Sequence, residues 1–95
     1  MIKSFRDRET EEIFNQRPVR RFRGIEKVAL RKLVMIAAAV KPEMLREPPG
    51  NRFEALHGDR EGQYSIRIND RYRICFTWSD GAENVEIVDI PLRRR

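Results

Sequence analysis

Two segments with an apolar residue at every second position constrain the fold of this chain most strongly. They cover residues 64–68 and 72–78, and only Asn69, Asp70 and Arg71 separate them. A period of two is typical of a strand with one buried face, and so short a connection joins antiparallel neighbours. Opposite residues in a hairpin share a face, so this odd-length connection places both apolar sets on one side. The pattern predicts an antiparallel hairpin.

Earlier in the chain the apolar spacing is helical. Asp7 can cap a first helix that runs to about Asn15, with glutamates near its positive end. From Ile25 the apolar residues recur at intervals of three and four until the chain approaches Pro42, which predicts a second helix. The apolar stripe of this second helix consists of Ile25, Ala29, Leu33, Ile36 and Val40.

Three further short strands are expected around the hairpin. One covers residues 85–90 after a turn at Asp80-Gly81, and one covers residues 1–5. A third lies just before the hairpin, with Phe53 and Ala55 toward the core. A chain of 95 residues is long enough for one hydrophobic core and too short for two. Residues 1–95 are therefore expected to form a single domain.

Composition narrows the class of partner and the compartment. The formal charge is +5, and arginine dominates the cations. Because a guanidinium matches phosphate oxygens, this bias favours nucleic acid as partner, although the fifteen acidic residues also fit a well-solvated basic surface.

The lone Cys75 cannot form an internal disulfide, and residues 33–40 are too short an apolar run for a membrane helix. We expect a reducing cytoplasm and no membrane partner.

The second face of the predicted hairpin carries the best candidate for a phosphate site. It holds Ser65 and three arginines, Arg67, Arg71 and Arg73. Guanidinium groups that converge on one surface repel one another unless an anion lies between them. The alternative is an exposed polar face on which acidic neighbours pair with the arginines.

Polar residues just before the hairpin would lie beside these arginines. Arg52 and Glu54 are expected to point outward, and His57 and Arg60 follow closely. An RNase needs a base for the 2′-hydroxyl, positive charge at the phosphate and an acid for the leaving oxygen. Glu54, His57 and the arginines could supply all three, although a lone histidine is often an ordinary surface residue. No ligand spacing for a metal and no Gly-rich phosphate loop is present.

Several phrases in this order resemble the HigB branch of the RelE/ParE toxin superfamily, and together they span almost the whole chain. The phrases are Ile2-Lys3-Ser4-Phe5, Pro48-Pro49-Gly50-Asn51-Arg52, Leu56-His57-Gly58-Asp59-Arg60, Tyr64-Ser65-Ile66-Arg67-Ile68-Asn69, Tyr72-Arg73-Ile74-Cys75-Phe76-Thr77-Trp78 and Val85-Glu86-Ile87-Val88-Asp89.

The resemblance implies fold, activity and partners. The fold would be α+β, with two N-terminal helices packed on a small twisted antiparallel sheet, as in microbial RNases. The activity would be cleavage of mRNA in the A site of the 30S subunit, by 2′-hydroxyl attack, with no metal and no cofactor. The partner would be a HigA-like helix-turn-helix antitoxin, through which alone the chain would meet operator DNA.

The resemblance also implies roles for individual residues. Arg73 matches the sheet arginine that stabilises the scissile phosphate, and Asp89 matches the aspartate of the family's Asp-Tyr-His motif. Glu54 falls where some members have histidine, and His57 falls where many have lysine. The expected RNA-binding residues are the arginines near this site and at the end of the sequence: Arg52, Arg60, Arg67, Arg71, Arg93, Arg94 and Arg95.

The sequence departs from the family pattern directly after Asp89. Ile90-Pro91 stands where relatives have Tyr-His, and neither residue can take up or give a proton. Either His57 or Glu54 carries more of the proton transfer, or the protein is a weakened toxin that keeps antitoxin and ribosome binding. A ParE-like inhibitor of gyrase is a further alternative, which the phrases match less well.

Overall fold

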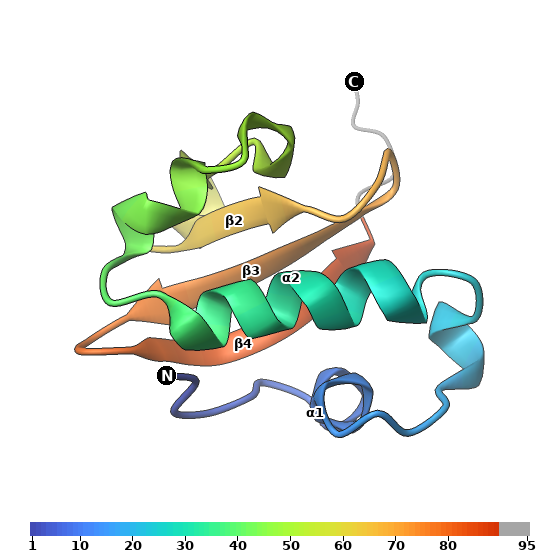
Figure 1. Cartoon of the computed structure of the whole chain (residues 1–95). Helices are drawn as coiled ribbons and strands as arrows, with labels where there is room; N and C mark the ends of the chain where they lie inside the picture. Colours follow the sequence, from blue (N-terminus) through green and yellow to red (C-terminus); the bar gives the residue numbers. More distant parts are fainter. Residues whose placement is uncertain (90–95) are drawn as a thin grey trace.

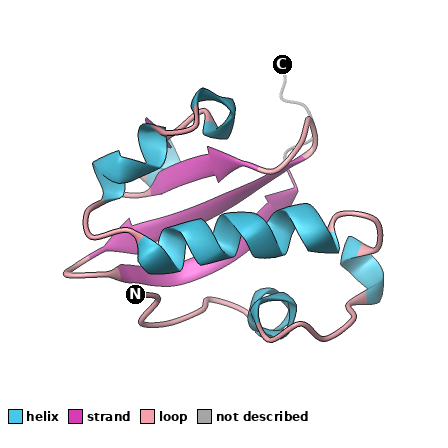
Figure 2. Ribbon diagram, in the orientation of Figure 1, coloured by secondary structure: helices cyan, strands magenta, loops and turns pink. Residues whose placement is uncertain are grey.

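The structure is a computed structural model that describes residues 1–89, and it has two layers (Figure 1). Helices α1 (Arg8–Phe14) and α2 (Glu26–Ala38) lie on one face of a four-stranded antiparallel sheet. The strands follow the order β1 (Glu54–Ala55), β2 (Tyr64–Arg67), β3 (Tyr72–Trp78) and β4 (Ala82–Asp89). Short 3-10 helices lie between α1 and α2, between α2 and β1, and between β1 and β2, whereas loops join β2 to β3 and β3 to β4 (Figure 2). The predicted α+β class is confirmed.

The hairpin of β2 and β3 has the predicted register. Tyr64 stands opposite Phe76, and Ile66 stands opposite Ile74. The apolar residues of both strands face the helices, where Ile66 and Ile74 are fully buried with Leu33 of α2. We call this side of the sheet the helix face and the opposite side the outer face.

Helix α1 begins where the sequence predicted. The Asp7 side chain accepts a hydrogen bond from the Thr10 N–H at 3.4 Å, which satisfies one free donor of the first turn. The buried Thr10 hydroxyl in turn accepts a bond from the Ile87 N–H at 2.9 Å. This contact fixes α1 against β4.

Helix α2 confirms the predicted apolar stripe except at its end. Ala29, Leu33 and Ile36 are fully buried, but Val40 is 80% exposed. The helix stops at Ala38 because Ala39 is already extended, and the residue before Pro42 is also extended. Val40 therefore lies beyond the helical spacing that would have turned it inward.

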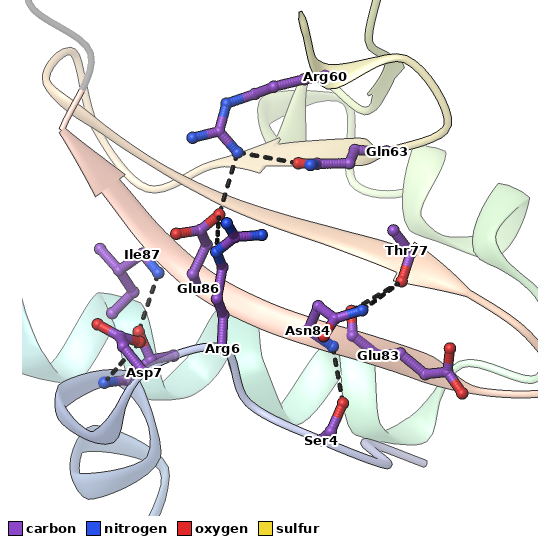
Figure 3. Close-up of polar contacts among 11 residues, drawn as sticks. Ser4, Arg6, Asp7, Arg60, Gln63, Thr77, Glu83, Asn84, Glu86 and Ile87 are labelled. Atoms are coloured by element: carbon purple, nitrogen blue, oxygen red, sulfur yellow. Dashed lines mark hydrogen bonds and ion pairs between the residues drawn. The ribbon is translucent and has the colours of Figure 1, made fainter.

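The expected first strand is reduced to two isolated parallel bridges, from Ile2 to Ala82 and from Phe5 to Val85. The reason lies in β4, where the register with β3 shifts and Asn84 adopts a positive φ of 55°. The Asn84 N–H is bonded instead to the Ser4 hydroxyl at 2.9 Å (Figure 3). Regular pairing of residues 1–5 is thereby interrupted.

Two other strand predictions needed adjustment. Strand β4 starts earlier than expected, at Ala82, and residue 90 lies outside the described part of the chain. Strand β1 has only two residues, and Ala55 is exposed rather than turned to the core. Within residues 1–89, no helix is long and apolar enough to cross a membrane.

Candidate functional site

Arg73 points to the outer face near the start of β3 and is fixed by two acceptors. Its Nε donates to the Ser65 hydroxyl on β2 at 2.9 Å, and one Nη donates to the Arg52 carbonyl at 2.7 Å. Ser65 is fully buried, and the Arg73 side chain is only 15% exposed. The guanidinium is therefore held in one orientation before any ligand arrives.

The charge of Arg73 is only partly compensated. Burial lowers the pKa of the Arg73 guanidinium, the Glu54 carboxylate raises this pKa, and Arg67 and Arg52 lower it further. Glu54 lies 3.6 Å away and is 59% exposed, whereas the two hydrogen-bond acceptors are neutral. An arginine stays protonated even in such surroundings. A phosphate oxygen beside Arg73 would therefore relieve a poorly solvated charge.

Arg67 lies beside Arg73, as predicted, and the positive charge of Arg52 also acts on the Arg73 guanidinium. Arg67 stands directly opposite Arg73 in the pairing of β2 with β3. Its guanidinium pairs with Asp70, whose side chain is fully exposed. Exposed ion pairs contribute little, so a phosphate could replace this partner at small cost.

Arg60 reaches the outer face from the turn between β1 and β2. Its guanidinium donates to Gln63 at 2.9 Å and to Glu86 of β4 at 3.0 Å (Figure 3). The same oxygen of Glu86 lies 3.8 Å from Nε of Arg6. Glu86 stands opposite Cys75 in the sheet, so the guanidinium of Arg60 lies above the middle strands.

Arg71 does not join these arginines, so the prediction of three converging guanidinium groups was wrong in this respect. Its guanidinium lies 5.0 Å from the ring centroid of Tyr72, which faces the helices, and donates to Asp89 at 2.8 Å. The physical reason is that Arg71 belongs to the turn before β3, where the alternation of faces does not yet hold.

Asp89 is likewise separated from Arg73 by the sheet. It pairs with Tyr72 in the register, which places it on the helix face. The hydrogen bond from Arg71 lowers the pKa of the Asp89 carboxyl. Asp89 is therefore ionised at neutral pH and is unsuited to donate a proton.

The two expected proton carriers are both accessible. Glu54 lies beside Arg73, as its predicted outward orientation requires. His57 is exposed just before the turn Gly58–Arg60, and within residues 1–89 its side chain makes no hydrogen bond or ion pair. Their roles in proton transfer stay predictions. Arg93, Arg94, Arg95 and Ile90-Pro91 lie outside the described residues.

Sequence reasoning missed the residues that support the site from behind. Lys32 and Asn51 are buried and bonded to each other, and Glu86 holds Arg60. A signal for Lys32 existed, because it follows Ala29 by three residues and precedes Ile36 by four, which places it beside the buried stripe. Within the described chain, no three His, Cys, Asp or Glu side chains gather as metal ligands would.

Comparisons with known proteins agree with this architecture. Residues 3–92 match the family described as the RelE-like toxin of type II toxin–antitoxin system HigB. The chain is 41% identical to Toxin HigB-1 of Vibrio cholerae over 83 residues, which is 85% of this chain and 87% of that protein. It is also 40% identical over 61 residues to an uncharacterised protein of Haemophilus influenzae, covering 64% of this chain and 60% of that one.

Proposed function

This chain belongs to the HigB-like family of RelE-like toxins of type II toxin–antitoxin systems, and from that premise we propose that it is a ribosome-dependent mRNA endoribonuclease. The observation that carries the proposal is the preoriented guanidinium of Arg73, which is 15% exposed and lies beside the carboxylate of Glu54. A fixed cation stabilises the negative charge that develops on the phosphate during phosphoryl transfer, and a carboxylate beside it can act as a base.

The proposed reaction needs no group beyond the RNA and these side chains. The 2′-oxygen attacks the adjacent phosphorus, loses its proton to a base and forms a cyclic phosphate, while the bond to the 5′-oxygen breaks. Glu54 is the candidate base, because it lies 3.6 Å from the Arg73 guanidinium that would hold the phosphate. His57 is the candidate acid, because its side chain is exposed and an imidazole can serve as a general acid.

A second candidate function follows from the sequence after Asp89. Ile90-Pro91 removes a proton carrier that the family pattern includes, so a weakened toxin that binds ribosomes and antitoxin is the alternative. Induced expression without antitoxin decides between the two. Growth arrest with cleaved transcripts supports the endoribonuclease, whereas intact transcripts support the binding protein.

We expect ribosome binding to weaken steeply with salt. The arginines expected to contact phosphates are Arg52, Arg60, Arg67 and Arg73. With four such contacts, log K against log salt should have a slope of about −3, which is roughly a 50-fold loss of affinity between about 50 and 200 mM salt. Cosedimentation across this range measures the slope. The variant Arg52→Ala/Arg67→Ala should reduce it by about 1 to 2. Binding that does not change with salt would contradict phosphate contacts as the source of affinity.

The partner in this proposal is a HigA-like antitoxin with a helix-turn-helix. The side of α2 that faces solvent offers it an apolar surface, formed by Leu30, Val34, Met35 and Ala38. Val34 is 51% exposed, and Lys27 and Arg31 border the surface. An apolar segment with acidic flanks would fit there. Because the sheet separates this surface from Arg73, the antitoxin could hold the toxin without covering the outer face.

Val34→Asp is expected to weaken the complex with the antitoxin by at least about 10-fold in Kd, because it places a charge within an apolar contact. Titration calorimetry with the purified antitoxin measures the change. Arg73→Ala is the control and should bind as the wild type does. Weakening by Arg73→Ala, with Val34→Asp binding as the wild type does, would instead place the antitoxin on the outer face.

A further inference from the structure

The Arg52 carbonyl, which accepts a hydrogen bond from Arg73, directly follows a loop that the buried side-chain amide of Asn51 holds together. Asn51 is fully buried, and its Nδ2 donates to the carbonyls of Leu45 at 3.1 Å and Glu47 at 3.3 Å. Its own N–H donates to the Pro48 carbonyl at 2.9 Å. These three bonds close the loop from residue 45 to residue 51 on itself.

Lys32 of α2 determines how this amide is oriented. Its Nζ donates to Oδ1 of Asn51, and the lysine is only 7% exposed. Within residues 1–89 no carboxylate pairs with it, and a buried ammonium with a single amide acceptor is unfavourable for stability. An ammonium has only donors, so it fixes the oxygen of Asn51 toward α2 and the NH₂ toward the loop carbonyls.

The next residue depends on this arrangement. Arg52 has φ 48° and ψ 51°, a left-handed conformation that residues other than glycine seldom adopt. Its N–H donates to the Pro49 carbonyl at 3.0 Å, and its own carbonyl accepts the bond from Arg73 at 2.7 Å. A strained conformation persists only where its neighbours fix it. Asn51 directly precedes Arg52 in the chain and is itself held by Lys32 and by the carbonyls of Leu45 and Glu47.

We propose that Lys32 and Asn51 are positioning residues for Arg73, acting through the Arg52 carbonyl. The inference rests on the proposed function of Arg73 for its consequence in catalysis. Its structural part is independent of that function: Lys32 and Asn51 keep one Nη group of Arg73 hydrogen-bonded to the Arg52 carbonyl. A side chain on α2 would thus set the orientation of the outer-face guanidinium from the opposite side of the sheet.

The test measures separately the two hydrogen bonds that hold Arg73, from Nε to Ser65 and from Nη to the Arg52 carbonyl. In ¹⁵N-arginine-labelled protein, exchange with solvent is measured for the Nε and Nη protons of Arg73. Asn51→Ala should speed exchange at Nη and leave Nε protected by Ser65, whereas Ser65→Ala should do the reverse. Lys32→Met should act as Asn51→Ala does, more weakly. Lys27→Met makes the same substitution on the exposed side of α2 and should change neither signal.

Cleavage provides the second measurement. Asn51→Ala should lower the single-turnover rate on ribosome-bound mRNA by about 10-fold, with ribosome affinity within about twofold of the wild type. Folded Asn51→Ala and Lys32→Met proteins with unchanged Nη protection would overturn the inference. If Asn51→Ala does not fold, Lys32→Met alone decides, and if neither folds the pair is structural and the inference fails. Lost Nη protection with unchanged cleavage would uphold the structural link and overturn its consequence for catalysis, while Arg73→Ala decides the proposed function separately.

Discussion

Arg73→Ala is expected to lower the rate of single-turnover mRNA cleavage by about 100- to 1000-fold. Negative charge accumulates on the phosphate oxygens in the transition state, and the fixed guanidinium of Arg73 would stabilise that charge. Because Ser65 and Arg52 hold it in advance, little reorganisation accompanies the reaction. Single-turnover cleavage of a defined transcript on purified ribosomes measures the effect.

Two matched variants separate catalysis from binding. Arg67→Ala removes the arginine that stands opposite Arg73, and it should weaken ribosome binding more than it slows the bound enzyme. Arg73→Lys keeps a positive charge but cannot reach both Ser65 and the Arg52 carbonyl with a planar fork, so it should restore only part of the rate. An Arg73→Ala protein that cleaves at the wild-type rate would remove Arg73 from the mechanism.

Local patterns predicted the elements that form this site. The alternation in residues 64–68 and 72–78 fixed both the hairpin and its register, since a shift by one residue would expose Ile66 and Ile74. Asp7 marked the start of α1 because a carboxylate satisfies free N–H groups there. The sequence therefore placed Arg67 and Arg73 on one face.

Contacts between distant segments were not predictable in the same way. Arg71 continues the alternating sequence pattern but lies in the turn before β3, and its guanidinium turns toward Asp89, a contact that depends on where β4 ends. Lys32 and Asn51 are nineteen residues apart, and only the packed loop brings them together. Lysine is rarely buried, so the residue type gives no reason to expect Lys32 in the interior. Its contact with Asn51 is visible only in the folded structure.

Replacing Ile90-Pro91 with Tyr-His is expected to raise the cleavage rate by about 100- to 10,000-fold if proton transfer limits the present enzyme. The two residues lie outside the described structure, and the expectation rests on the chemistry of their side chains. Neither isoleucine nor proline can carry a proton, whereas a histidine with a pKa near 6.5 can act in either direction at neutral pH. The comparison is again single-turnover cleavage on ribosomes, with the wild type and the restored variant side by side.

Controls assign the gain to the imidazole. Ile90→Tyr with Pro91 retained, and Pro91→Gln, change the same positions without adding a titratable group near neutrality, so neither should reach the restored rate. If the new histidine acts as the acid, the gain is present below its pKa and declines as the pH rises through it. A wild type that is already fast and does not improve would mean that His57 or Glu54 carries the proton. If neither protein cleaves while both bind ribosomes, the endoribonuclease proposal fails and the binding protein is the better description.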